Sequence, residues 1–229
     1  MTNVQILPES FGFLKTLEAN NNRDWFAANK DAYLTAQNNI AACVDHLILL
    51  MNDHDHLENK SGKKSLYRIY NDVRFSKDKT PYGARFAFSL RRATPYKRGG
   101  YYTHLKPGSS YLACGFFAPN PADLKRIRTD IVYNHQEWRK ILDSKLFKKN
   151  FDVLLGNLVP TVPRGFDKEH IAIDLIRHKQ FILKHTFTDE EVLNPNFLFN
   201  ANEIFKSVRP FFDYLSMVLT TDANGEMII

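Results

Sequence analysis

The chain has 229 residues, of which 44% are hydrophobic, 13% aromatic and 24% charged, and its formal net charge is +6. A chain of this length buries about 72% of its extended surface on folding, so its core needs neither disulfide bonds nor a structural metal. This composition excludes an intrinsically disordered chain, and the short apolar runs exclude a spanning helix, which needs about 20 residues.

The first fifty residues have the apolar spacing of helices. After Pro8, the positions of Phe11, Leu14 and Leu17 predict a short helix. Asn22 is a suitable N-cap for a second helix of about eight turns that ends near Asn52. The apolar stripe of this long helix consists of Phe26, Tyr33, Ala36, Ile40, Cys43, Val44, Leu47 and Leu50.

From Tyr67 the apolar period changes to two, which is typical of strands. Residues 67–75 predict a half-buried strand, a loop covers residues 77–83, and residues 84–91 predict another strand. A further pair of strands follows Gly99, the first ending at Lys106 and the second at Phe117, with a two-residue turn at residues 107–108. In the register of that turn, Tyr102 and His104 share a sheet face with Tyr111 and Ala113.

The last part of the chain is mainly helical. Asn120, followed by a proline and an acidic residue, predicts the start of a helix, and Asp167 predicts the N-cap of another that contains residues 171–176. Residues 181–183 predict a short strand, and residues 202–219 predict a final helix.

This element order predicts an α+β fold. The expected architecture is a central antiparallel sheet with the N-terminal and C-terminal helices packed on one face and the other face partly open. No linker or repeat divides the sequence, so we expect one domain over residues 1–229.

The positive charge is concentrated in the middle of the chain. Residues 60–106 contain 13 Lys or Arg and two acidic residues, a net charge of +11, together with six of the ten tyrosines. Positive groups beside aromatic faces suit a surface that holds phosphates and bases. A solvated sheet face with tyrosines at its edges would produce the same pattern.

Residues 68–82 carry the densest group of candidate site residues. On a strand, Arg68, Tyr70, Asp72 and Arg74 would point the same way, and the carboxylate would hold both guanidinium groups while leaving N–H donors for a ligand oxyanion. In the alternative interpretation, Asp72 only neutralises its neighbours, and residues 77–79 form an exposed turn.

The segment Arg-Phe-Ser-Lys-Asp-Lys-Thr-Pro-Tyr at residues 74–82 resembles the core motif of the family catalogued as domain of unknown function 2461. Residues 21–26 resemble the early motif of that family, and residues 163–167 with His170 resemble its late motif. The resemblance covers nearly the whole chain. It implies a single soluble α+β domain and assigns no activity, cofactor or catalytic residue.

Two histidines are candidate acid–base residues. On a helix, His170 would be a general base oriented by Asp174, with Arg164 and Arg177 holding an anion. A capped surface helix with an ordinary Asp174–Arg177 pair fits the same spacing. His104 would lie near Arg85 and Arg91, and these cations would favour its neutral form; simple exposure on a strand is the alternative.

The sequence predicts no cofactor and no metal site. It contains no P-loop, dinucleotide glycine fingerprint, nucleophile elbow or zinc signature. The adjacent residues 53–56, Asp-His-Asp-His, have metal-ligand chemistry, but adjacent side chains rarely converge on one ion. Asp167, His170 and Asp174 would share one face of a helix, and a surface helix explains that spacing better than a metal site does.

The sequence also predicts the cellular compartment of the protein. The first nine residues lack the basic head and apolar stretch of a secretory signal. The two cysteines, Cys43 and Cys114, fit a reducing compartment. We therefore expect a cytoplasmic protein without a membrane partner.

We expect the open sheet face and the loop at residues 77–82 to form a basic, tyrosine-lined concavity that binds a phosphorylated or other anionic small molecule. An enzyme acting on an anionic substrate through a histidine and a nucleic-acid-binding module are the alternatives, and the oligomeric state is not predicted. The expected ligand-binding residues are Arg68, Asp72, Arg74, Lys77, Lys79, Tyr82, Arg85, Arg91, Tyr102 and Arg164.

Overall fold

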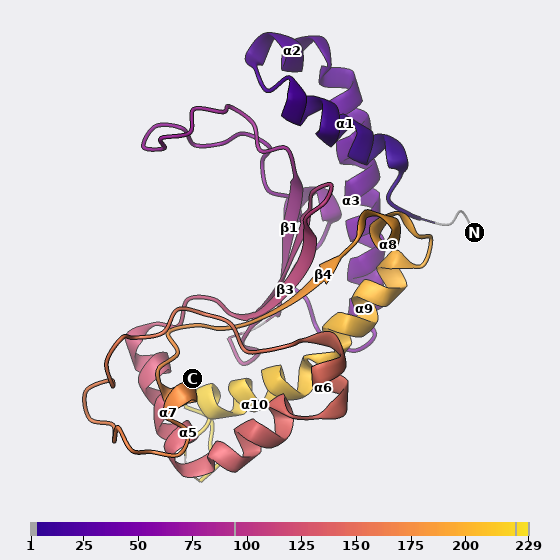
Figure 1. Cartoon of the computed structure of the whole chain (residues 1–229). Coiled ribbons are helices and arrows are strands. Elements are labelled where there is room, and N and C mark those ends of the chain that lie inside the picture. Colours follow the sequence, from indigo (N-terminus) through magenta and orange to yellow (C-terminus); the bar gives the residue numbers. More distant parts are fainter. Residues whose placement is uncertain (1–3, 94, 223, 229) are drawn as a thin grey trace. The chain divides into compact units, whose positions relative to one another are not determined.

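A computed structural model describes residues 4–93, 95–222 and 224–228 (Figure 1). The four strands form one antiparallel sheet in the order β1-β2-β3-β4, which confirms the predicted α+β fold. In chain order the elements are α1 (Pro8–Ala19), α2 (Arg23–Ala28), α3 (Lys30–Asn52), α4 (Gly62–Ser65), β1 (Phe86–Arg91), β2 (Gly100–Leu105), β3 (Ser110–Phe116), α5 (Pro121–Leu142), α6 (Lys145–Asn150), α7 (Ile173–Ile176), β4 (Phe181–Phe187), α8 (Asp189–Leu193), α9 (Phe197–Ser207) and α10 (Arg209–Thr220).

The chain forms two compact units, and each of them is assembled from three separate segments. Unit 1 consists of Met1–Leu90, Tyr102–Leu112 and Thr186–Glu203, and unit 2 consists of Arg91–Tyr101, Ala113–His185 and Ile204–Ile229. Strands β2 and β3 contribute residues to both units. The single domain expected over residues 1–229 stays a prediction.

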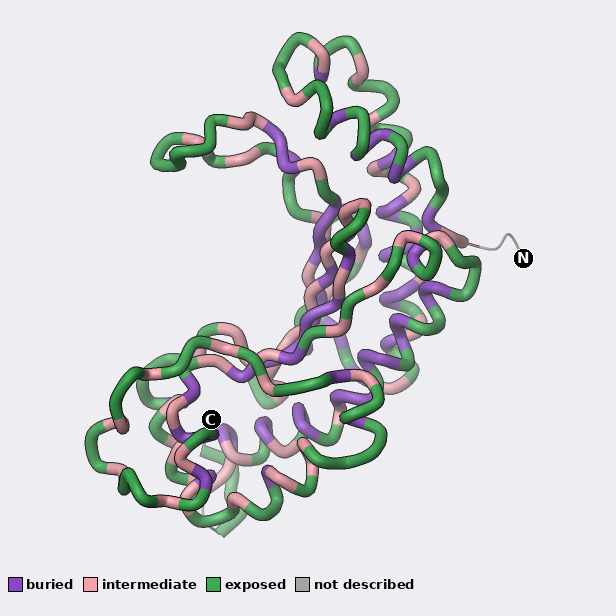
Figure 2. Tube along the Cα trace, viewed as in Figure 1, coloured by how far each residue is buried: buried purple, intermediate pink, exposed green. Residues whose placement is uncertain are grey.

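In unit 1, helices from both ends of the chain cover one face of the sheet. Side chains of α3 and α9 line a small apolar cavity together with Phe88, Thr103, Leu105 and Leu112 of the strands. Alternate residues of β2 are half-buried, as is Tyr111 of β3, so the opposite face is partly open to solvent at these positions (Figure 2). Both features agree with the sequence prediction, because alternation places successive side chains on opposite faces.

The β2–β3 hairpin has the predicted turn. The Ser109 N–H donates to the Lys106 carbonyl oxygen at 2.9 Å, and Gly108 has a φ of +74°, as the third residue of a type II turn requires. The rings of His104 and Tyr111 stack with centroids 4.8 Å apart, which confirms that these two side chains share a face.

The long helices are interrupted where the sequence predicted continuity. Asn22 caps α2 through the Trp25 N–H as expected, but α2 ends at Ala28 and α3 begins at Lys30. The Asn29 side chain donates to the Trp25 carbonyl oxygen, and this local bond competes with the helical one. The predicted final helix is likewise two helices, because Pro210 has no N–H to continue α9.

The strand predicted over residues 67–75 is wrong. The structure has only an isolated bridge between Tyr70 and Tyr82, followed by an exposed loop over residues 72–80 (the basic loop), which extends from unit 1 between α4 and β1 in Figure 1. Ile69 is buried, but Phe75 is 97% exposed. The apolar alternation of the sequence therefore extends to Phe75, although the fold provides no surface that would bury the Phe75 side chain.

The helix predicted to start at Asp167 is also wrong. The Asp167 carboxylate accepts the Glu169 N–H in a turn, and α7 begins only at Ile173. By contrast, α5 begins after the predicted cap, where the Asn120 side chain accepts the Asp123 N–H. Among the described residues, no helix is both long enough and apolar enough to cross a membrane.

The core of unit 2 contains a buried arginine. The guanidinium group of Arg92 is 1% exposed and donates to Asp213 at 2.7 Å, to the Arg98 carbonyl oxygen and to the Ser216 hydroxyl. It also lies over the Phe212 ring, 5.3 Å from the centroid. A buried guanidinium is tolerated only when its donors are satisfied, so this set of acceptors is required by the fold.

We expect Asp213→Asn to lower the free energy of unfolding by about 2 kcal/mol, because the buried Arg92 loses its counter-charge. The control is Asp143→Asn, which breaks an exposed pair with Lys148 and should cost less than about 0.5 kcal/mol. Urea unfolding monitored by circular dichroism measures both values. Equal losses in the two variants would contradict a special role for the buried arginine.

Candidate functional site

Unit 1 contains a hollow of about 340 Å³ that has the predicted composition of basic and tyrosine side chains. It opens on the partly exposed sheet face, since Ala87 of β1 and Tyr102 of β2 line it. The complete lining is Tyr67, Arg68, Tyr70, Gly83, Arg85, Ala87 and Tyr102.

An irregular segment that runs beside β1 forms one wall of the hollow. The Tyr67 N–H donates to the Ala87 carbonyl oxygen at 2.8 Å, and the Gly83 N–H donates to the Ile69 carbonyl oxygen at 2.7 Å. Because Ile69 is buried in the core, its neighbours Arg68 and Tyr70 are left exposed. The backbone thus presents one cation and one aromatic ring on the same wall.

The base of the basic loop is fixed by Asn21. The Asn21 side chain donates to the Tyr82 carbonyl oxygen at 2.9 Å and accepts the Tyr82 N–H at 3.1 Å. The Tyr82 ring stacks on Phe26 with centroids 4.0 Å apart. Tyr82 is 6% exposed, and burial raises the pKa of its hydroxyl. It was predicted as a ligand contact, but its place in the structure is in the core, where it positions the loop.

Two arginines line the hollow, and neither forms a salt bridge in the part of the chain that the structure describes. Within the described ranges, the guanidinium groups of Arg68 and Arg85 make no hydrogen bond or salt bridge, although Arg68 contributes to lowering the pKa of the Asp72 carboxyl. A side chain at Gly83 would collide with the Arg85 guanidinium, so glycine leaves the space that this arginine occupies. Both guanidinium groups therefore keep N–H donors for a ligand.

Tyr102 supplies a protonated hydroxyl to the same hollow. Burial, followed by the neighbouring Tyr111, raises its pKa to about 12, and the positive charge of Arg85 only partly opposes this shift. Its hydroxyl oxygen is 3.4 Å from Nδ1 of His104. At neutral pH Tyr102 is a hydrogen-bond donor rather than a base. His104 lies on the same open face but outside the residues that line the hollow.

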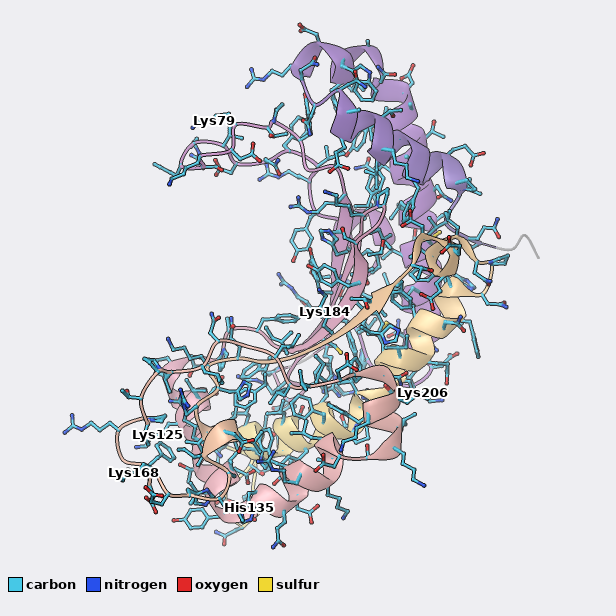
Figure 3. All side chains as sticks on the ribbon, viewed as in Figure 1. Lys79, Lys125, His135, Lys168, Lys184 and Lys206 are labelled. Atoms are coloured by element: carbon cyan, nitrogen blue, oxygen red, sulfur yellow. The ribbon has the colours of Figure 1, made fainter. Side chains whose placement is uncertain are left out.

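The basic loop binds much of its own charge. The Arg74 guanidinium donates twice to Asp72, at 2.9 and 2.7 Å, and this contact is the main cause of the lowered pKa of the Asp72 carboxyl. The Lys79 ammonium group donates to the Val73 carbonyl oxygen at 2.9 Å, and Figure 3 shows Lys79 on this loop. Asp72, Arg74, Lys77 and Lys79 do not line the hollow. The interpretation of Asp72 as a neutralising residue agrees with this geometry.

Two further predicted ligand-binding residues, Arg91 and Arg164, belong to unit 2. Arg164 lines a separate hollow of about 670 Å³ together with Lys125, Phe166 and His170. The structure therefore does not place these two arginines among the residues that line the hollow of unit 1.

The predicted pairing of His170 with Asp174 is wrong. Asp174 accepts two hydrogen bonds from Arg139, at 2.6 and 2.7 Å. Nδ1 of His170 is 3.1 Å from the Ala172 N–H, which donates to it, and Nε2 is 3.2 Å from the Val132 carbonyl oxygen. With both ring nitrogens held by the backbone, His170 is not placed as a general base. The pairing fails because the helix that would align the two residues begins only at Ile173.

The structure offers no evident metal centre: within residues 4–93, 95–222 and 224–228, no three His, Cys, Asp or Glu side chains are grouped so as to hold an ion. In the segment of residues 53–56, His54 contacts the Asn202 side chain and the Asp55 carboxylate accepts the His56 N–H.

Sequence reasoning did not select Tyr67 and Tyr70, which form much of the wall. The signal was present, because both lie within two residues of Arg68 in the basic segment. The assumed strand placed Tyr67 on the face opposite Arg68, whereas the irregular backbone brings both side chains to one hollow.

The raised pKa of Tyr102 predicts the outcome of a spectroscopic titration. At pH 11, a tyrosine with a pKa of about 12 is about one-tenth ionised, whereas one with the usual value near 10 is about nine-tenths ionised. Tyr102→Phe should therefore remove little tyrosinate absorbance at this pH in the folded protein, and nearly one full tyrosine in concentrated urea. A full tyrosine lost in the folded state would contradict the assigned environment.

The sequence of the chain matches a known protein family. Neither the curated proteins nor the solved structures provide a match. The family model described as "Conserved hypothetical protein (DUF2461)" matches residues 9–214. That range includes the three motifs at residues 21–26, 74–82 and 163–170, and it covers most of the chain. The chain therefore belongs to this family.

Proposed function

We propose that the hollow of unit 1 binds an anionic small molecule, and that a phosphate group is the part it recognises. The observation that carries the proposal is the pair Arg68 and Arg85, whose guanidinium groups line one hollow and make no salt bridge among the described residues. The planar fork of a guanidinium group matches the oxygens of a phosphate or carboxylate in a bidentate geometry.

The tyrosines add two further properties to the proposed site. The protonated Tyr102 hydroxyl can donate a hydrogen bond to an anionic oxygen, and the rings of Tyr67 and Tyr70 offer flat apolar walls. A volume of about 340 Å³ lies at the lower end of the range for small-molecule sites. The ligand that fits this chemistry is a phosphate ester of a small planar or apolar group.

Binding is better supported than catalysis by a histidine. Both ring nitrogens of His170 are held by backbone groups, and His104 stacks on Tyr111 outside the lining of the hollow. General acid–base catalysis needs a group within hydrogen-bond reach of the reacting atom. We therefore propose ligand binding as the function of this hollow.

The test is calorimetric titration with phenyl phosphate. The double variant Arg68→Gln/Arg85→Gln should bind at least about tenfold more weakly, because it loses charge-assisted hydrogen bonds to the phosphate. The matched control is Lys63→Gln/Lys64→Gln, which removes the same charge from exposed positions of α4 in the same unit.

The control should leave the affinity within about twofold of the wild type, since surface charges away from the ligand are screened. An equal loss of affinity in both double variants would mean that binding depends only on the net charge of the protein. Unchanged affinity in Arg68→Gln/Arg85→Gln would remove the hollow as the binding site.

A further inference from the structure

We infer that the hollow is one part of a longer surface of unit 1 that binds single-stranded nucleic acid. The inference rests on the proposed function, because Arg68 and Arg85 supply the phosphate contacts in both cases. It extends that function by naming the ligand class, a chain of nucleotides whose bases stack on protein rings.

A continuous series of aromatic rings crosses the open sheet face. The ring centroids of Tyr67 and Tyr102 are 6.0 Å apart, those of Tyr102 and Tyr111 are 6.0 Å apart, and His104 stacks on Tyr111 at 4.8 Å. These four residues form the aromatic face. Its rings extend past the hollow, since His104 and Tyr111 are not among the lining residues. One planar group would cover only part of this series.

The basic loop presents another ring to solvent. Phe75 is 97% exposed, which is an unfavourable position for a wholly apolar side chain. The loop is held by its own contacts: Arg74 pairs with Asp72, the Asp78 carboxylate accepts the Thr80 N–H at 2.9 Å, and Lys79 donates to a backbone carbonyl. The loop is thus built to hold Phe75 outward, next to the exposed cation Lys77.

The hollow and the basic loop are adjacent in the structure. Tyr70 and Gly83 line the hollow, and the bridge between Tyr70 and Tyr82 forms the base of the loop. Figure 1 shows the loop leaving unit 1 directly beside the edge of the sheet formed by β1. Aromatic rings and cations therefore follow one another from the loop to the hollow, and the series of rings continues from the hollow onto the aromatic face.

Charge and geometry favour a single strand over other occupants. Among the described residues the guanidinium groups of Arg68 and Arg85 have no salt bridge, so they suit anionic partners, and the solvent-accessible rings suit flat partners; unstacked bases along a phosphate chain supply both. A duplex keeps its bases stacked inside and would use the cations alone. An uncharged or basic protein surface would offer neither arginine an anionic partner.

The test measures the fluorescence anisotropy of a labelled short oligothymidylate. We expect Phe75→Leu and Tyr67→Leu each to weaken binding about fivefold or more, since each removes a stacking ring from an exposed side chain. The matched control is Tyr133→Leu, which replaces a 77% exposed tyrosine of unit 2 and should leave the affinity unchanged.

Salt dependence identifies the phosphate contacts. The logarithm of the affinity should fall with the logarithm of the salt concentration by about 0.7 for each phosphate neutralised on a single strand. The variant Arg68→Gln/Arg85→Gln should therefore reduce this slope by about 1.4, while Phe75→Leu should leave it unchanged.

Three results would overturn the inference. They are no binding of the oligothymidylate, equal or tighter binding of a duplex of the same length, and unchanged affinity in both Phe75→Leu and Tyr67→Leu. If phenyl phosphate still binds and depends on Arg68 and Arg85, the proposed function stands and only the nucleic-acid inference fails. If neither probe binds, both fail.

Discussion

The geometry of the site depends on the clamp between Asn21 and the backbone of Tyr82. The carboxamide of Asn21 has one donor and one acceptor in the arrangement of a peptide group, so it pairs with Tyr82 as a neighbouring strand would. This contact closes a chain segment of 61 residues, and the Phe26 ring stacked on Tyr82 reinforces it. Since Gly83 follows directly and the Gly83 N–H holds Ile69, the clamp sets the position of Arg68. Two of the three family-like motifs, at residues 21–26 and 74–82, therefore contact each other and together position the site.

Folding offsets part of the high positive charge of residues 60–106, and the distribution of the remaining charge decides where a ligand can bind. Acidic residues from distant segments neutralise part of it, because folding brings them close. The distant pairs are Arg92 with Asp213, Arg98 with Asp123, and Lys106 with Glu18, whereas Arg74 pairs locally with Asp72. A count of charges along the chain overestimates the available cations, since it does not include partners far away in sequence. What is left on the open face of unit 1 is a cationic site centred on Arg68 and Arg85, with the aromatic face beside it.

Local signals in the sequence predicted those elements that local interactions determine. The cap at Asn120 and the turn at Gly108 are each satisfied within four residues, and both are present in the structure. The strand over residues 67–75 was wrong because alternation indicates a possible buried face without showing that the fold supplies one. The residues of the candidate site likewise divide into those that local sequence signals predict and those that depend on the path of the folded backbone. Arg68, Arg85 and Tyr102 were predicted from charge and register, and the alternation placed Tyr70 on the face of Arg68, while Tyr67 depends on an irregular backbone path that no periodic pattern describes.

Buried and exposed arginines have different roles in this protein: the buried one contributes to stability, and the exposed ones are available for binding. Arg92 is buried, so every acceptor around it is needed to offset the loss of hydration. Arg68 and Arg85 are exposed, so water solvates their guanidinium groups and the fold does not depend on a partner for them. The side chains of this site are solvated, while buried contacts hold the backbone beneath them. Replacing such a side chain therefore changes the contacts to a ligand but costs little folding free energy. Substitutions at Arg68 and Arg85 therefore report on recognition, whereas substitutions at Asn21, Phe26 or Tyr82 would alter the scaffold and the site together.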